Sequence, residues 1–489
     1  MTESSVWERL GSPKFVVAPM VDASELAWRM LSRRHGAQLC FTPMLHSNIF
    51  VKHPRYRTAN LVTCEEDRPL IVQFCGNDPD ILLEAAKLAE PFCDAIDINL
   101  GCPQAIAKRG HYGAFLQDDW DLLYKIVSTL SRELTVPVTC KVRIFSSVEH
   151  SIAYAQMLES AGCKILTVHG RTKDQKGPLT GLASWEHIRA VRDNVKVPVI
   201  ANGNIQCLAD IERCLVATRC HAVMSAEGNL YNPALFEGIS PPAYELALEY
   251  LDLVEKYPCP RSYVRGHLFK LFHDCFSLPE NSDLRHEIAK AQNMKQFRAT
   301  VLHLKERYHA IHEGLTPWNQ QYTSYDLQLP PWLCKSFVRQ TPQEHLEKIG
   351  KIVERIKVVN YEKENEENQT ECLVRHKREH SVEPLLSKKK MKKLQKHQSV
   401  NPHCRRVVEK CSKCPNPVGL KCEFVLCKSC CRLKCYLENF DCAGHRILIR
   451  TRRERAKKRD AIKSKEKTNT EKSEIYSSQE HVDLQVACR

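Results

Sequence analysis

Residues 95–103 read Ala-Ile-Asp-Ile-Asn-Leu-Gly-Cys-Pro, and the expected fold is built outward from this stretch. Its first five residues are typical of a β-strand, and the Gly-Cys-Pro that follows predicts a loop. A cysteine between Gly and Pro therefore lies on a loop rather than in the core. On its own, Cys102 is either a structural cysteine in a turn or a reactive one.

The same pattern recurs along the first half of the chain, where short β-rich runs alternate with segments of helical spacing. Eight alternations in about 230 residues predict a (β/α)8 TIM barrel, an α/β fold of typically ~250 residues, over residues 13–240. The competing fold is an open doubly wound sheet. The predicted strands are Phe15–Pro19, Gln38–Thr42, Leu70–Cys75, Ala95–Asn99, Val138–Arg143, Ile165–His169, Val197–Ala201 and Ala222–Ser225. The clearest helices between them are Pro79–Ala89, Asp119–Leu134, Glu149–Ser160 and Ala209–Leu215.

Polar side chains stand at the C-terminal ends of most of these strands. Barrels hold their active sites on that face, so the side chains are expected to converge. This placement favours the barrel over the open sheet. The motifs are Ala18–Asp22, Gln73–Gly76, Asp97–Pro103, Cys140–Arg143, Val168–Thr172 and Ala201–Asn204.

Residues 241–345 lack a strand pattern and predict a helical domain. Residues 346–403 predict a charged, largely disordered linker, 404–446 a Cys-rich module, and 447–489 a basic and then polar tail. The expected helices are Tyr244–Glu255, Val264–Phe276, Leu284–Ala291 and Met294–His312.

The net charge of +14 in 489 residues is concentrated in the last 120 residues, for example at 388–393 and 450–459. Such a basic excess indicates a polyanionic partner, and nucleic acid is the first candidate. No stretch approaches the ~20 apolar residues of a membrane span, and no signal sequence opens the chain. We expect a monomer in a reducing compartment, cytoplasmic and/or nuclear.

Nine of the 24 cysteines lie between Cys404 and Cys442, in short Cys-x2-Cys pairs followed by a histidine. This spacing predicts a zinc module with two ions, with a disulfide framework as the alternative. It resembles the RING-like finger of a group of plant transcription regulators. Either Cys431 or Cys435 could be spare, and the module could contact RNA or a protein. The expected ligands are Cys411, Cys414, Cys422, Cys427, Cys430, Cys431, Cys442 and His445.

The run Asp97–Pro103, with Gly113-Ala114 downstream and the other strand-end motifs in order, resembles the signature of the tRNA-dihydrouridine synthases. Residues 39–46 and 104–112 look most like the eukaryotic subgroup that acts on positions 16 and 17 of the tRNA D-loop. The resemblance implies FMN-dependent reduction of the uracil C5–C6 double bond, with NADPH or NADH as reductant. It also implies that the helical domain binds tRNA.

In this resemblance Cys102 donates the proton to C5, because a thiol can act as a general acid at neutral pH. Asn99 and Arg171 would meet the substrate. One departure is Ala226-Glu227-Gly228, where relatives usually have Gly-Arg-Gly, so an acid replaces a cation near the phosphate. The implied cofactor-binding residues are Pro19, Met20, Val21, Gln73, Lys141, His169, Asn202, Gly203, Asn204, Ala226 and Glu227.

Two alternatives stay open at this point. One is a flavin barrel that acts on a free small molecule, such as a dihydroorotate or dihydropyrimidine dehydrogenase-like enzyme, although such a substrate needs neither helical domain nor basic tail. The other is an RNA-binding scaffold whose barrel is catalytically weak or inactive. The intact Cys102, Lys141 and His169 argue against the scaffold, and Glu227 favours it.

Overall fold

The computed structural model describes residues 5–318, 329–337, 341–347, 411–413, 418–419, 422–445, 447–451 and 453–454. The chain divides into two compact units, Met1–Cys372 and Leu373–Arg489. The expected linker 346–403 and the basic runs lie almost wholly outside the described residues. Cys414, an expected zinc ligand, also lies outside them.

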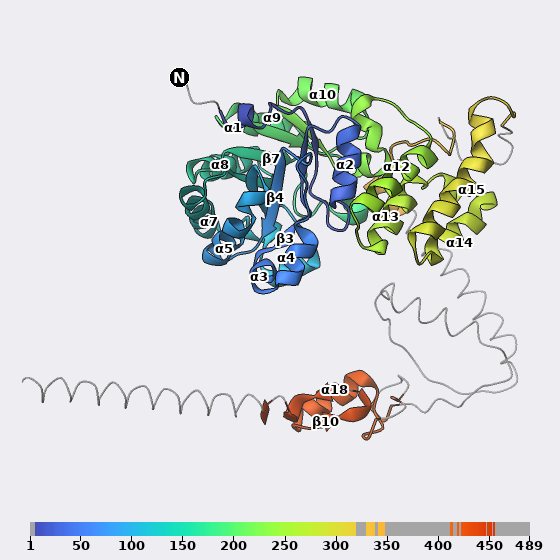
Figure 1. The fold of residues 1–489 in the computed structure, drawn as a ribbon. Coiled ribbons are helices and arrows are strands. Elements are labelled where there is room, and N and C mark those ends of the chain that lie inside the picture. Colours follow the sequence, from blue (N-terminus) through green and yellow to red (C-terminus); the bar gives the residue numbers. More distant parts are fainter. Residues whose placement is uncertain are drawn as a thin grey trace, which may run out of the picture. The chain divides into compact units, whose positions relative to one another are not determined.

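The first unit contains a closed barrel of eight parallel strands, which confirms the predicted fold class (Figure 1). Each strand pairs with the next in parallel, β9 pairs with β1, and the pairing of β2 with β4 completes the ring. The barrel strands are β1 Phe15–Val17, β2 Leu39–Phe41, β4 Leu70–Cys75, β5 Ala95–Leu100, β6 Val138–Arg143, β7 Ile165–His169, β8 Val199–Asn202 and β9 Ala222–Ser225.

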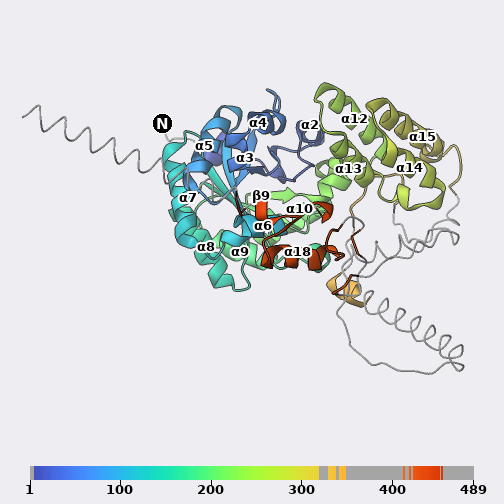
Figure 2. The same cartoon turned by 90° about the horizontal axis from the view of Figure 1, so that it is seen from below.

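Helices surround the strands on the outside, as the view in Figure 2 shows. Five of them begin at a side chain that accepts a backbone N–H of the first turn, namely Ser5, Asp78, Asp119, Ser147 and Ser184. The helices are α1 Val6–Arg9, α2 Leu26–Arg34, α3 Ser47–Lys52, α4 Pro54–Asn60, α5 Pro79–Ala89, α6 Ala105–Gly110, α7 Trp120–Glu133, α8 Val148–Ser160, α9 Trp185–Asp193, α10 Leu208–Thr218 and α11 Glu227–Tyr231.

Helix α2 is tied to the loop that precedes β4 by a buried ion pair. Arg29 and Arg33 both reach the carboxylate of Asp67, at 2.6 and 3.2 Å, and Asp67 is fully buried. Arg29 also donates to the carbonyls of Ser24 and Val62. The guanidinium is therefore fully engaged, which is the condition under which a buried charge is tolerated.

A group of helices follows the barrel within the same unit, at one side of it in Figure 1. Its core includes Trp28 of α2, so it packs directly on the barrel. The boundary predicted at residue 240 stays a prediction. The prediction of one helix over Val264–Phe276 is wrong: the apolar spacing continues through Phe276 in the core, but the helical backbone ends at Leu271. The helices are α12 Ala243–Lys256, α13 Arg261–Leu271, α14 Ser282–Lys290 and α15 Met294–His312.

The second unit contains a small module built on α18 Lys428–Leu437. Strands β10 Asp441–Cys442 and β11 Ile447–Leu448 pair antiparallel, with the short turn of helix η8 Ala443–His445 between them. Its core consists largely of cysteine side chains with Leu426 and Ile447. Among the described residues, no helix is both long and apolar enough to cross a bilayer.

Candidate active site and metal-ligand clusters

The predicted site residues lie at the C-terminal ends of the barrel strands. All eight strands are parallel, so these ends meet at one face of the barrel. Gln73 is in β4, Asn99 in β5, Lys141 in β6, His169 ends β7 and Asn202 ends β8. The others follow directly after a strand: Pro19, Met20 and Val21 after β1, Cys102 after β5, Arg171 after β7, Gly203 and Asn204 after β8, and Ala226 and Glu227 after β9.

A line of hydrogen bonds runs from inside the barrel to the loop that carries Cys102. Asp97 accepts from Thr139 Oγ1 at 2.6 Å and from Gln73 Nε2 at 2.8 Å. Gln73 Oε1 accepts from Asn99 Nδ2 at 2.9 Å. Asn99 Oδ1 then accepts the backbone N–H of Cys102 at 2.9 Å, and more weakly that of Gly101. The two buried amides thus connect Asp97 to the cysteine loop.

The carboxylate of Asp97 sets the orientation of both amides. An ionised carboxylate only accepts hydrogen bonds, so the nitrogen of the Gln73 amide must face it. The oxygen of Gln73 then faces Asn99, whose own nitrogen must turn toward it. Consequently the oxygen of Asn99 is directed at the loop. Burial raises the pKa of Asp97 to about 6, although its hydrogen bonds and Lys141 oppose the shift, so Asp97 is ionised at neutral pH.

Lys141 and Asn202 form a second contact at this face. Asn202 donates through Nδ2 to the carbonyl of Met224, so its Oδ1 accepts from Lys141 Nζ at 2.8 Å. Burial, and then the neighbouring Arg143, lower the pKa of Lys141 to about 8. Lys141 is therefore a cation at neutral pH that sits close to its deprotonation.

His169, Arg171 and Asn204 form a third group. Arg171 lies 3.0 Å from His169 Nε2 through Nη1, and it donates through Nη2 to Asn204 Oδ1 at 2.9 Å. Burial first, and then Lys141, Arg143 and Arg171, hold the pKa of His169 well below its ordinary value. The imidazole is neutral at physiological pH and accepts from Arg171, so the three surrounding cations keep their full positive charge.

Gly203 allows a close approach to this group. Its φ of +121° is strained for any residue with a side chain, and a Cβ here would lie 2.6 Å from the Cβ of Ala183. It would also lie 3.3 Å from His169 Cδ2 and 3.5 Å from Arg171 Nη1. The turn after β8 therefore presents bare backbone beside the cationic donor Arg171, which suits an anion.

The remaining predicted residues also lie near this face. The backbone N–H of Met20 donates to Ser24 Oγ, and Val21 is 56% exposed. Glu227 opens helix α11. Burial lowers the pKa of Lys270, and the charges of Glu25 and Glu227 oppose that shift, which places Glu227 close to a cation of α13.

Arg143 was missed by the sequence reasoning as a site residue. Its buried guanidinium donates to the carbonyls of Gly101, Thr172 and Gln175, so it joins the Cys102 loop to the loop after β7. The signal was present, because residues two apart in a strand face the same side. Lys141 faces the site, so the alternation along β6 places Thr139 and Arg143 on the same side.

The Cys-rich module brings most of its predicted ligands into two groups. Cys422, Cys431, Cys442 and His445 form one, with all four ligand atoms within 4.8 Å of one another. The other consists of Cys411, Cys427 and Cys430, again within 4.8 Å. Cysteine sulfurs at this separation, together with imidazole, are the donor set that zinc prefers.

The chain is similar to known proteins over most of its length. Residues 16–308 match the family described as Dihydrouridine synthase (Dus). A Mus musculus protein named tRNA-dihydrouridine(16/17) synthase NAD(P)(+)-like is 50% identical over 458 residues, covering 92% of this chain and 91% of its own length. A Saccharomyces cerevisiae tRNA-dihydrouridine(16/17) synthase is 42% identical over 372 residues, which cover 69% and 86% of the two chains. A Homo sapiens tRNA-dihydrouridine(20a/20b) synthase-like protein is 34% identical over 268 residues, covering 54% and 84%.

The fold and the site define a TIM-barrel enzyme with a cationic reaction face and a cysteine on the loop after β5. The chain belongs to the dihydrouridine synthase family and is an oxidoreductase.

Proposed function

We propose that this protein reduces uridine to dihydrouridine in the D-loop of tRNA, with FMN as the cofactor and NADPH or NADH as the reductant. The observation that carries the proposal is the line of hydrogen bonds from Asp97 to the Cys102 loop. It holds one cysteine in a fixed position beside the cations at the C-terminal face of the barrel.

The residues at this face fit FMN. Lys141 and the polar edge of Gln73 suit the flavin ring, and Lys141 can stabilise negative charge on it. Arg171, Asn204 and the bare backbone at Gly203 suit the phosphate. Glu227 cannot pair with a phosphate, so we assign the positive charge at this end to Arg171. When bound, reduced FMN supplies a hydride to C6 of the uracil.

Cys102 completes the reduction by donating its thiol proton to C5. The carbon gains a C–H bond, the sulfur keeps the electron pair as a thiolate, and solvent water returns the proton afterwards. Asn99 takes part through the backbone of the loop, since its Oδ1 accepts the N–H of Cys102. Arg143 supports the same loop from the other side through the carbonyl of Gly101. We further propose that the side chains of Asn99 and Arg171 meet the flipped-out base.

Positions 16 and 17 are the substrate positions that we propose. The mouse relative named for these positions is 50% identical over nearly the whole chain, whereas the human relative named for positions 20a and 20b is 34% identical over about half of it. The helices α12 to α15 would bind the tRNA body, with cationic contacts to phosphate that weaken with salt.

The Cys-rich module is proposed to bind zinc. Seven of its eight predicted ligands are described, and all seven fall into the two groups of close donors. The module is then folded by its metal ions, because so short a segment has little other core. A tRNA-binding assay that compares the full-length protein with a variant lacking residues 404–446 tests whether the module contacts tRNA.

The test of the proposal is a map of dihydrouridine in tRNA from cells that carry only the Cys102→Ala variant. We expect dihydrouridine to disappear at positions 16 and 17 and to persist at 20a and 20b. Cys64→Ala is the matched control, because Cys64 is also half-buried but packs against Met30 away from the site. A map unchanged by Cys102→Ala would refute the proposal. If the purified enzyme reduced free uridine as fast as it reduces uridine in tRNA, tRNA would not be the specific substrate.

A further inference from the structure

The two groups of metal-ligating side chains alternate along the sequence. Cys411 belongs to the first group and Cys422 to the second; Cys427 and Cys430 belong to the first, and Cys431, Cys442 and His445 to the second. Neither group is a continuous stretch of chain. The segments that supply the two groups are therefore interleaved along the chain.

Helix α18 explains how neighbouring residues serve different groups. Adjacent residues in an α-helix are about 100° apart around the axis, because a turn takes 3.6 residues. Cys430 and Cys431 therefore point to different sides of the helix. Cys427 caps the helix N-terminus, and its Sγ accepts the N–H of Cys430 at 3.5 Å, which places both on the side of the first group.

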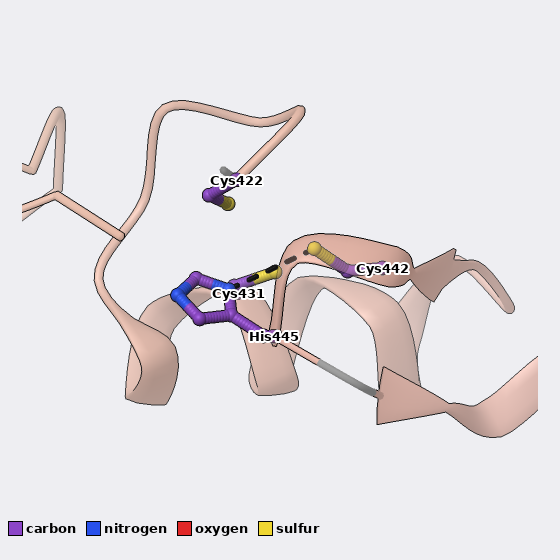
Figure 3. A group of neighbouring side chains, drawn as sticks. All are labelled: Cys422, Cys431, Cys442 and His445. Carbon is purple, nitrogen blue, oxygen red and sulfur yellow. Dashed lines mark hydrogen bonds between the residues drawn. The ribbon is translucent and has the colours of Figure 1, made fainter. Parts of the chain in front are cut away.

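The second group has the shape of a closed tetrahedral site. Figure 3 shows its four side chains pointing toward one another from a loop, from α18 and from the segment that includes β10 and η8. With Zn–S bonds of about 2.3 Å, tetrahedral ligand atoms lie about 3.8 Å apart. Cys442 Sγ lies 3.7 Å from His445 Nδ1, which matches this separation.

Cys435 is the competing ligand. It lies one helical turn after Cys431, is fully buried, and its Sγ is 3.9 Å from that of Cys431. It is nevertheless outside the set whose atoms all approach one another within 4.8 Å. Gly419 leaves room for the imidazole of His445, since a Cβ at this position would overlap its Nε2. Four protein ligands complete a structural zinc site, so no position remains for Cys435 at the ion of the second group.

We infer that Cys422, Cys431, Cys442 and His445 hold one zinc ion, that Cys411, Cys427 and Cys430 serve a different ion, and that Cys435 serves neither. This inference rests on the proposed binding of zinc. Because the groups are interleaved through α18, loss of a ligand in one group also weakens binding of the other ion. Cys435 is a core residue that packs under the second site.

The test measures zinc per chain in the purified full-length protein by elemental mass spectrometry. We expect two ions in the wild type and in Cys435→Ser, and one or none in Cys431→Ser and His445→Ala. Cys435→Ser is the matched control, since it removes the same atom from the same face of α18.

A second measurement does not depend on whether the variants fold. Zinc-edge X-ray absorption of the wild-type protein should show imidazole scattering from one ligand among the ligands of the two ions. A wild type without zinc contradicts the proposed metal binding itself. Two ions with sulfur ligands alone, or loss of an ion in Cys435→Ser but not in His445→Ala, overturns the assignment of ligands while zinc binding stands.

Discussion

Asn99→Asp is the sharpest test of how the Cys102 loop is held. The substitution keeps the size of the side chain and keeps an acceptor for the N–H of Cys102. It removes the Nδ2 donor that Gln73 Oε1 accepts at 2.9 Å. Gln73 cannot compensate by turning its amide over, because its oxygen would then face the carboxylate of Asp97. In the variant, Gln73 Oε1 therefore faces a carboxylate oxygen at position 99, and neither atom can donate a hydrogen bond.

The size of the expected loss of activity follows from this one lost hydrogen bond. A buried polar atom left without its hydrogen bond costs about 1–3 kcal/mol. Because about 1.4 kcal/mol is a factor of ten in rate, we expect the rate of uridine reduction to fall roughly 10- to 100-fold if the cost falls on the loop. The assay is a single turnover of tRNA transcript by the reduced holoenzyme, with FMN affinity measured separately. FMN reduction by NADPH should change little, since it does not need the proton from Cys102.

Asn194→Asp is the matched control for this prediction. The same chemical change removes an amide that donates to the carbonyl of Ala190 at the exposed end of α9. Its turnover should equal that of the wild type. If Asn99→Asp also reduces tRNA within about threefold of the wild type, the hydrogen-bonded line does not position the cysteine and the reasoning is wrong.

Three further predictions concern pH and stability. FMN binding, measured by fluorescence titration, should weaken as the pH rises from about 7 to about 9. The reason is that Lys141, with a pKa of about 8, loses the charge that attracts the flavin. The Lys141→Met variant should bind FMN weakly and without this pH dependence. Asp67→Asn should lower the free energy of unfolding in urea by about 3–5 kcal/mol, because it leaves two guanidinium groups of α2 without their buried carboxylate. Tyr250→Phe should cost about 1.5–3 kcal/mol through the lost 2.6 Å bond to the buried Glu25, whereas Tyr154→Phe, whose buried hydroxyl has no partner among the described residues, should cost nothing.

The barrel was predictable because its strands are short apolar runs that end in polar motifs. Helices α5 and α15 were predicted to the residue, since both carry long apolar faces and an N-cap. Strand β3 and helices α3 and α4 were missed between the second and third predicted strands. They are only two to seven residues long, so they leave no periodic pattern, and α4 has no buried residue.

The site was predictable in its residue types but not in its connections. The strand-end motifs indicated Gln73, Asn99 and Lys141, which the structure places at one face of the barrel. The direction in which two amides turn depends on a carboxylate from the middle of β5, which only the folded barrel brings beside β4 and β6. In the metal module likewise, spacing predicted the ligands, while their division into groups follows from the two faces of α18.

The residues of the motif Asp97–Pro103 act together to position the N–H of Cys102. Asp97 and Asn99 face the same side of β5 because strand residues alternate, and the Gly-Cys-Pro turn brings the N–H of Cys102 back onto the second of them. Asp97 does not contact the loop itself. Because its carboxylate cannot donate a hydrogen bond, it fixes the orientation of the Gln73 amide and, through Gln73, that of the Asn99 amide. Since the pKa of Asp97 is about 6, the constraint weakens once acid protonates the carboxylate and lets it donate. A residue that would touch neither cofactor nor substrate then sets how firmly the proton donor is held.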